Sequence, residues 1–234
     1  MRNILDLRDR VLNLLKDRLD GFYLAGGTGL SLFYYHHRDS FDLDFFTQDF
    51  SRVKVNRLME ELSGLIKLNI ELSAERAQED RAKIMVYFLE ADKGISLKID
   101  FIEDTFKLIK EPNIVNGIPV SSLEDIYLKK IYAVSGVSQN LDSTGRGRIV
   151  GGRQEAKDFF DLYFLSTTFM PISKFLMLYC NQGQRENIII WYRSYNRIMI
   201  KLGLNELITD KLVDYTAMER HFKLEVSKIV EQII

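Results

Sequence analysis

Residues 26–46 of this chain, GGTGLSLFYYHHRDSFDLDFF, hold the pattern from which its fold and chemistry can be predicted. Near the end of this stretch, Asp42 and Asp44 stand two residues apart between apolar neighbours. Side chains two apart on a β-strand point to the same face, so both carboxylates would leave one face while Leu43 turns to the core. Carboxylate oxygens suit Mg²⁺, which takes the rest of its shell from water and phosphate. The sequence therefore predicts that Asp42 and Asp44 bind Mg²⁺ or Mn²⁺. The alternative is a half-exposed edge strand whose carboxylates are solvated.

A glycine-rich turn precedes this acidic strand. Residues 22–25 are apolar and predict a short buried strand, after which Gly26 and Gly27 let the chain turn sharply into a helix expected over 28–36. Backbone N–H groups at a helix N-terminus attract phosphate, so Gly27 and Thr28 are candidates for binding a triphosphate. The simpler interpretation is a tight turn capped by the Thr28 hydroxyl, and the two roles are compatible.

This arrangement resembles the nucleotidyltransferase superfamily typified by DNA polymerase beta, in which a glycine-rich turn precedes an Asp-x-Asp strand. More narrowly, residues 26–46 are similar to the AbiEii/AbiGii toxin family of nucleotidyltransferases. Later segments match that family's motifs in the same order, within roughly residues 22–165: Leu123–Ile126 with Lys130 and Ala133, then Arg153 with Lys157–Leu165. One departure is the long polar stretch 138–152, which carries Arg146 and Arg148 where the family usually has a short loop.

The resemblance implies metal-dependent nucleotidyl transfer. An NTP would be held at Gly27 and Thr28, with Arg153 as a further nucleotide-binding residue, and a metal on Asp42 and Asp44 would bridge its phosphates. A hydroxyl acceptor would attack the α-phosphate, and pyrophosphate would leave. The family also implies a toxin of a type IV toxin–antitoxin or phage-defence pair, with a cognate antitoxin and, for some members, the 3′ end of tRNA as the acceptor.

Two helical segments carry the remaining candidates. The resemblance makes Lys130 a cation that offsets charge on the leaving phosphates, and helical spacing places Lys130 beside Ile126 and Ala133 on the more apolar face, about 100° from Lys129. The resemblance also makes Asp158 part of the active site, orienting Lys130 or the nucleotide, and makes Asp161 chiefly structural. Without the resemblance, Asp158 and Asp161 would be a surface pair that bonds Lys157 or Arg153.

A third acidic residue could join the metal site. Asp100 lies in the alternating segment 95–102 and could reach the same face as Asp42 and Asp44, which would complete the acidic triad of the superfamily. The alternative is an ordinary carboxylate near a strand end.

The pattern of elements predicts an α+β (mixed α/β) fold. Helices are expected over 3–19, 54–65 and 154–167 and from 123 onward, and strands over 41–46, 66–73, 83–89 and 95–102. Only helices are expected after about residue 105, at least three of them beyond Pro171, with Pro112, Gly117 and Pro119 marking a seam. We therefore expect a nucleotidyltransferase-like domain over 1–120, with a small mixed sheet flanked by helices, and a helical domain over 121–234 that contributes the active-site Lys and Asp.

Composition limits the partners. The formal net charge is −1, which argues against strong non-specific binding to nucleic acid. The single cysteine, Cys180, excludes an internal disulfide, and no apolar run is long enough to cross a bilayer, so we expect a cytoplasmic protein without a membrane partner. His36 and His37 are adjacent and have no third ligand nearby, which makes zinc a poor candidate.

The acceptor is left open by the residues themselves. Arg193, Arg197 and Lys201 recur every four residues and are predicted to share one helix face, either solvated or in contact with RNA; Arg146 and Arg148 are the other available cations. The alternatives are transfer to a small molecule or a protein side chain, and a catalytically silent domain that binds nucleotide or a partner. The preferred NTP, the oligomeric state and the existence of an antitoxin do not follow from the sequence.

Overall fold

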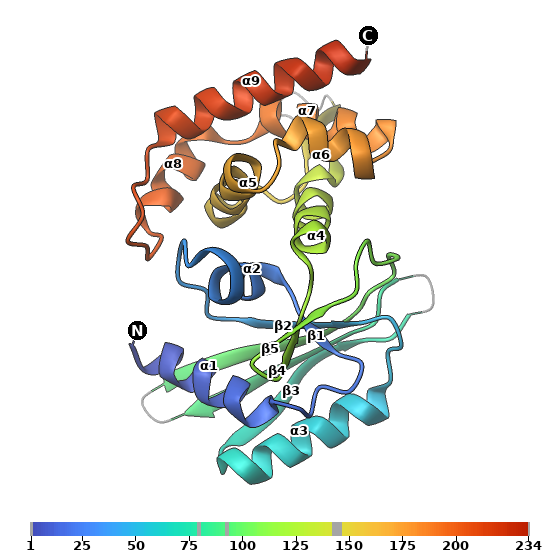
Figure 1. The fold of residues 1–234 in the computed structure, drawn as a ribbon, viewed down its shortest axis with the longest axis vertical. Helices are drawn as coiled ribbons and strands as arrows, with labels where there is room; N and C mark the ends of the chain where they lie inside the picture. Colours follow the sequence, from blue (N-terminus) through green and yellow to red (C-terminus); the bar gives the residue numbers. More distant parts are fainter. Residues whose placement is uncertain (1, 79–80, 92–93, 142–146, 234) are drawn as a thin grey trace. The chain divides into compact units, whose positions relative to one another are not determined.

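The computed structural model describes residues 2–78, 81–91, 94–141 and 147–233. The chain divides into two compact units, Met1–Ile126 and Tyr127–Ile234, and each is described by itself. The first unit holds a mixed sheet and the second is mainly helical (Figure 1). The predicted α+β class is confirmed. Within the described residues, no helix is both long and apolar enough to cross a membrane.

A seven-stranded sheet forms the centre of the first unit, in the order β3-β4-β5-β2-β1-β7-β6. The β1–β7 and β2–β5 pairs are parallel, and the other neighbours are antiparallel. The strands are β1 (Tyr23–Leu24), β2 (Leu43–Thr47), β3 (Asn69–Arg76), β4 (Ile84–Ala91), β5 (Ile95–Glu103), β6 (Asn113–Val115) and β7 (Ile118–Val120).

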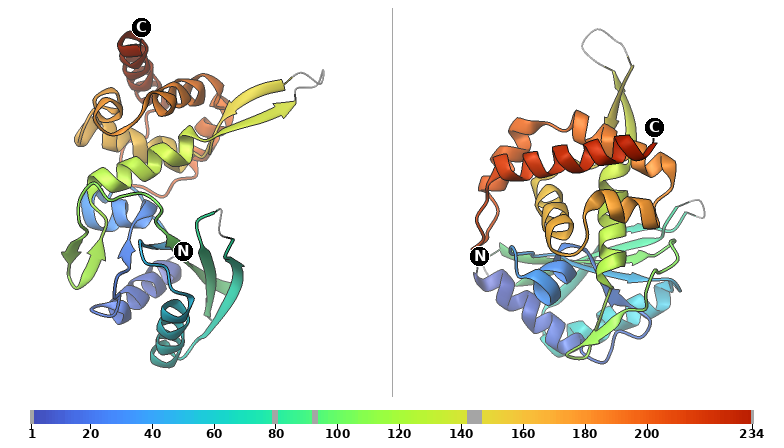
Figure 2. Two further views of the ribbon diagram at one scale, coloured as in Figure 1. Left: turned by 90° about the vertical axis from the view of Figure 1, so that its right-hand side faces the viewer. Right: turned by 45° about the horizontal axis from the view of Figure 1, so that its top comes forward.

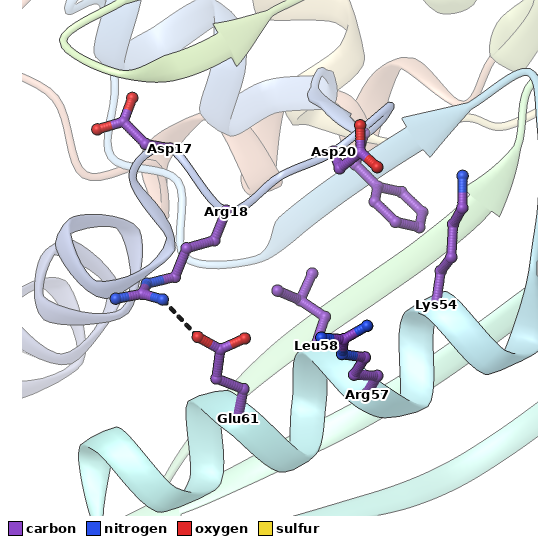
Figure 3. A pocket seen from close by; sticks show the side chains of 8 residues that line it. Asp17, Arg18, Asp20, Lys54, Arg57, Leu58 and Glu61 are labelled. Atoms are coloured by element: carbon purple, nitrogen blue, oxygen red, sulfur yellow. Dashed lines mark hydrogen bonds and ion pairs between the residues drawn. The ribbon is translucent and has the colours of Figure 1, made fainter.

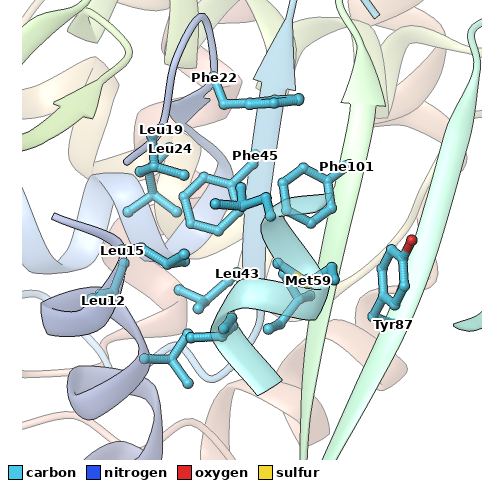
Figure 4. Packing of buried hydrophobic residues seen from close by; sticks show 14 of the residues in the cluster. Leu12, Leu15, Leu19, Phe22, Leu24, Leu43, Phe45, Met59, Tyr87 and Phe101 are labelled. Atoms are coloured by element: carbon cyan, nitrogen blue, oxygen red, sulfur yellow. The ribbon is translucent and has the colours of Figure 1, made fainter. Parts of the chain in front are cut away.

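The hydrophobic core of this unit lies between the sheet and two helices, α1 (Arg2–Leu15) and α3 (Arg52–Ile66). Leu43 and Phe45 of β2 are fully buried in it, and Phe45 stacks on Phe101 of β5 with ring centroids 5.5 Å apart (Figure 4). Because side chains alternate along a strand, the residues between them face away from α1 and α3. The alternation predicted for residues 41–46 therefore fixes which face of the sheet carries the acidic residues.

The glycine-rich turn starts its helix earlier than predicted. Helix α2 (Gly26–Leu30) continues into a π-helical turn, η1 (Ser31–Tyr35), which ends at His36 in the left-handed conformation. Gly26 has a φ of +65°, a value that favours glycine. The residue before the helix is Ala25, whose methyl side chain can make no capping hydrogen bond. The prediction of Thr28 as a hydroxyl cap is therefore wrong.

The expectation of helices alone after residue 105 is also wrong. The predicted seam forms the β6–β7 hairpin at the edge of the sheet, closed by Asn116 and Gly117, which both have positive φ. Two such residues between β-branched neighbours are the usual signal of a two-residue hairpin turn. A second hairpin, β8 (Val137–Leu141) and β9 (Gly147–Gly151), occupies the stretch predicted as a polar loop (Figure 2).

Helices build the rest of the second unit. Phe159 lies at the centre of its aromatic core, with the ring of Phe222 4.7 Å away and that of Trp191 6.1 Å away between centroids. The helices are α4 (Leu123–Ser135), which begins before the division of the chain, α5 (Ala156–Thr168), α6 (Ile172–Tyr179), α7 (Gln182–Ser194), α8 (Arg197–Asn205) and α9 (Tyr215–Ile233).

Candidate active site

Three carboxylates gather on the face of the sheet that points away from α1 and α3. Asp44 of β2 pairs in parallel register with Asp100 of β5, so the two residues are direct neighbours across the strands. Asp42 comes immediately before β2, two residues from Asp44, and both are half-buried. The sheet therefore brings together the three residues predicted as metal ligands, although Asp44 and Asp100 lie far apart in the chain.

Asp100 is the most enclosed of the three, with 8% of its surface exposed. Its Oδ2 accepts a hydrogen bond from Lys98, while its Oδ1 is buried without a hydrogen-bond partner among the described residues. Burial raises the pKa of the Asp100 carboxyl above its ordinary value; Lys98 opposes this rise and Asp42 adds to it. A buried carboxylate oxygen without a donor is unusual and calls for an explanation, of which a bound cation is one.

The donor set fits a hard divalent cation rather than zinc. Within the described residues, no group of three or more His, Cys, Asp or Glu side chains converges closely enough to hold a metal ion by itself. Mg²⁺ typically binds one or two carboxylates and keeps waters or substrate phosphates, so an open carboxylate face with one oxygen not engaged by the protein suits it. His37 is fully buried and His36 is exposed, so the two side chains are not directed toward one shared metal site.

The segment that carries Asp42 is held by hydrogen bonds to its backbone carbonyl groups. Arg8 of α1, itself 4% exposed, donates from Nη1 to the Ser40 carbonyl oxygen at 2.6 Å. The Ser31 hydroxyl donates to the Arg38 carbonyl oxygen, and the Thr28 hydroxyl donates to the Asp42 carbonyl oxygen. One donor from α1 and two from the continuous helix α2–η1 thus fix the backbone that positions Asp42.

Thr28 therefore serves the fold of the site. Its side chain is fully buried, and its hydroxyl lies 2.9 Å from the Ser40 hydroxyl as well as bonding the Asp42 carbonyl group. The structure brings Thr28 to the acidic segment, as predicted, but shows its hydroxyl bonded within the protein.

The two glycines of the turn face the site closely. A Cβ atom on Gly26 would overlap the Asp44 carboxylate, and a Cβ atom on Gly27 would overlap the guanidinium of Arg38. Arg38 is 7% exposed and donates from Nη1 to the Asp39 carbonyl oxygen at 2.9 Å. A positive charge therefore lies against the Gly27 backbone, a surrounding that suits an anion.

The second unit contains its own buried ionic cluster. The Lys130 ammonium of α4 lies 2.8 Å from Asp158 Oδ1 and 2.7 Å from Asp161 Oδ2, both on α5. Arg153 also binds Asp158, with Nη2 2.8 Å from Oδ1 and Nε bonded to Oδ2. Lys130 is 5% exposed and both carboxylates are fully buried, whereas Lys129 is only partly buried. The helical phase predicted for the two lysines matches this burial.

The charges in this cluster compensate one another. Burial alone would raise the pKa of the Asp158 carboxyl, but the charges of Lys130 and Arg153 outweigh that effect and hold its pKa below the ordinary value. Asp161 approaches Lys130 as closely as Asp158 does, so both carboxylates orient the ammonium. The surface position in the alternative interpretation of the two acids is wrong, because neither carboxylate is exposed, whereas the bond to Arg153 is present at Asp158.

The predicted stripe of cations on one helix face does not exist. Arg193 lies in the last turn of helix α7, which ends at Ser194. The chain is extended at Tyr195 before Asn196 caps the new helix α8 by accepting from the Met199 N–H at 3.1 Å. Arg197 lies over the rings of Tyr192 and Tyr195, 4.9 Å from the second, and 4.0 Å from a Glu219 oxygen. The other cations predicted for RNA, Arg146 and the Arg148 side chain, lie outside what the structure describes.

Sequence reasoning missed two polar residues of the carboxylate face. Lys98 was detectable, because it stands two residues before Asp100 on an alternating strand and so shares its face. For Arg38 the sequence shows only a basic residue near the Asp-x-Asp motif. Its approach to Gly27 depends on the path of the segment 36–42, which the sequence does not reveal.

A separate cavity of about 330 Å³ lies between the end of α1 and helix α3 (Figure 3). It mixes basic residues with acidic ones, and Arg18 and Glu61 form an ion pair at its side. Its described lining contains none of the predicted site residues.

Comparisons with known proteins agree with this architecture. The model of a family described as nucleotidyl transferase AbiEii toxin, type IV TA system, matches residues 10–230. An uncharacterized protein of Aquifex aeolicus is 30% identical over 149 residues, which cover 62% of this chain and 57% of that protein. The chain thus aligns with little more than half the length of this relative.

Two solved structures share the fold at low sequence identity. JHP933 from Helicobacter pylori is 16% identical with a TM-score of 0.59, and the match covers 100% of this chain and 94% of that one. MenT4, a nucleotidyltransferase toxin from Mycobacterium tuberculosis, is 15% identical with a TM-score of 0.53, covering 97% and 83%. At these identities the likeness concerns the fold.

Proposed function

Since the chain belongs to the AbiEii family of nucleotidyl transferase toxins of type IV toxin–antitoxin systems, we propose that it transfers a nucleotide from an NTP to a hydroxyl acceptor at the carboxylate face. The observation that carries this proposal is the register of Asp44 with Asp100, together with the buried Oδ1 of Asp100, which has no hydrogen-bond partner in the described part of the chain. This register puts a third carboxylate beside the Asp-x-Asp pair.

In the proposed reaction the acceptor oxygen forms a bond to the α-phosphorus, and the bond from the α-phosphorus to the bridging oxygen breaks. Pyrophosphate leaves with that electron pair, and the hydroxyl proton passes to solvent. Mg²⁺ or Mn²⁺ at the face formed by Asp42, Asp44 and Asp100 would be held by one or two of these carboxylates together with water and phosphate, and it would supply charge stabilisation to the phosphates and the attacking oxygen.

The protein's own groups have separate tasks in this proposal. The Gly27 turn, with the Arg38 guanidinium against it, binds phosphate, and Thr28 keeps the Asp42 segment in place. From the second unit, Lys130 contributes positive charge for the phosphates, Asp158 orients Lys130, and Arg153 adds nucleotide contact. The support for these last roles is the orientation of Lys130 by two buried carboxylates.

For the acceptor we propose RNA, with the 3′ end of tRNA as the first candidate, and for the partner a cognate antitoxin protein. Both follow from the family rather than from a particular surface of this chain. A nearly neutral protein must concentrate its contacts with RNA phosphates in one place. Arg193, Arg197 and Lys201 do not provide that place as one helix face, because Arg197 lies over the ring of Tyr195 at the start of a new helix.

The test uses purified protein with α-labelled NTPs and Mg²⁺, and separately total tRNA, cell lysate or no acceptor. Label on RNA supports the proposal. Label on protein or on small molecules would select the other acceptor classes, and no transfer under any condition would select a silent binding domain.

Variants identify the site that performs the transfer. Asp42→Ala and Asp44→Ala are expected to reduce transfer at least about a thousandfold while keeping the fold, because neither half-buried carboxylate supports core packing. Asp100→Asn is expected to act in the same direction. Asp49→Ala is the matched control, since its carboxylate is 88% exposed just beyond β2 and should leave transfer unchanged. Near-normal activity of either Ala variant would exclude the metal assignment.

A further inference from the structure

Lys98 lies at the carboxylate face, and the proposed reaction gives it no task. Its ammonium bonds Asp100 Oδ2, and its side chain is 34% exposed, so it lies at the edge of the face rather than free in solvent. Lys98 and Asp100 stand two apart on β5 and therefore share one side of the strand. The other Asp100 oxygen, Oδ1, is the one that lacks a hydrogen-bond partner among the residues that the structure describes.

The same ammonium also faces the Asp-x-Asp pair. Leu43 of β2 pairs with Ile99 of β5, so Asp42 and Lys98 each stand one residue earlier at neighbouring positions. Lys98 accordingly interacts electrostatically with Asp42 and Asp44 as well as with Asp100. The charge of Lys98 thus acts on all three carboxylates.

We infer that Lys98 is a positioning residue that holds Asp100 by one oxygen and competes with divalent cations for the carboxylate face. Because the charge of Lys98 opposes that of a metal ion, the nucleotide-free protein takes a divalent cation weakly, and phosphates that bring more negative charge strengthen its binding. This inference rests on the proposed function and names the regulation of its metal site.

The ordinary explanation of Lys98 is a partly exposed ion pair of little energetic consequence. The two explanations predict different cation affinities once the lysine charge is removed. If Lys98 is only a surface pair, removing its charge leaves the affinity unchanged, whereas removing a competing cation raises the affinity. Even at the dielectric constant of water, a unit charge roughly 6 Å from a divalent ion changes its affinity by about tenfold.

The experiment measures Mn²⁺ binding to the full chain without nucleotide, by electron paramagnetic resonance of free Mn²⁺ at low salt. The wild type is expected to bind Mn²⁺ weakly, and Lys98→Met is expected to bind it about tenfold more tightly. Lys98→Arg keeps the charge and should stay within about twofold of the wild type. Lys83→Met is the matched control, because Lys83 pairs with Glu103 on the same sheet at 3.0 Å.

The Mn²⁺ affinities of the variants test the inference about Lys98 separately from the proposed transfer. If Lys98→Met binds Mn²⁺ no more tightly than the wild type, or if Lys83→Met gains as much affinity, the inference is wrong and the proposed transfer still stands. If Lys98→Arg gains as much affinity as Lys98→Met, the charge is not the cause and the inference is also wrong. If neither the wild type nor Lys98→Met binds Mn²⁺, the metal assignment of the proposed function fails along with the inference. Asp44→Ala should abolish binding, and circular dichroism confirms that each variant is folded.

Discussion

Lys130→Ala should destabilise the second unit severely, before any effect on catalysis is considered. The substitution removes an ammonium that is 5% exposed and leaves Asp158 and Asp161, both fully buried, without their shared partner. Breaking a buried ion pair from one side typically costs about 3–5 kcal/mol, because a charge is left uncompensated in the interior. Arg153 still neutralises Asp158, so the lower end, about 3 kcal/mol, is the expected loss.

The chain offers a direct reporter for this measurement. Its single tryptophan, Trp191, is 1% exposed and lies in the same unit, where its ring packs near Phe159 of the helix that carries both acids. Unfolding in urea followed by tryptophan fluorescence therefore reports the stability of this unit. The midpoint should fall strongly while the slope of free energy against denaturant stays constant, since the surface exposed on unfolding hardly changes.

Lys129→Ala is the control for the same helix. Lys129 is only partly buried, and its replacement should change the free energy of unfolding by less than about 0.5 kcal/mol. A loss below about 1 kcal/mol for Lys130→Ala, or an equal loss for the two variants, would refute the argument that Lys130 balances two buried carboxylates. Loss of transfer in Lys130→Ala can be assigned to catalysis only in urea-free buffer at a temperature where the variant is shown to be folded.

Two further predictions concern stability. Gly26→Ala should lower the free energy of unfolding by at least about 1 kcal/mol and also weaken Mn²⁺ binding, because it forces a Cβ into a positive-φ position and against the Asp44 carboxylate. The control Gly64→Ala, in helix α3 with open space around it, should stabilise the protein by about 0.5–1 kcal/mol. Urea unfolding and Mn²⁺ titration check both variants, and equal effects would contradict the crowding at Gly26. Burial lowers the pKa of His221, so the unfolded chain binds more protons and the free energy of unfolding should fall as the pH drops below about 6.5. His221→Leu should reduce this dependence on pH in urea unfolding, and an unchanged dependence in this variant would assign it to other groups.

Local patterns predicted the parts of the site that depend only on neighbouring residues. The alternation over 41–46 placed Leu43 and Phe45 in the core and the two acids on the opposite face, because a strand has a period of two whatever surrounds it. Helical phase likewise separated Lys130 from Lys129. The Asn116–Gly117 signal was equally local, but the prolines nearby were interpreted as a boundary between domains instead of a hairpin.

Long-range register could not be predicted in this way. Asp100 reaches Asp44 because β5 lies between β4 and β2, and this order brings a later strand back beside an earlier one. Alternation along 95–102 shows which residues share a face but not which strand lies alongside. The Arg193–Lys201 spacing failed for a related reason, since a period of four implies one face only while the helix continues, and Asn196 begins a new helix.

The hydrogen bonds that hold Asp42 in position were the part of the site least predictable from the sequence. Its segment is fixed by donors from Arg8, Thr28 and Ser31, and all three bond to backbone carbonyl groups. Every residue carries a carbonyl group, so the accepting side leaves no trace in the sequence, and the donors are ordinary residue types. A hydroxyl beside a glycine-rich turn therefore looks the same whether it contacts a nucleotide or holds the backbone. Only the folded chain shows that the Thr28 hydroxyl is bonded to the segment that carries the acids.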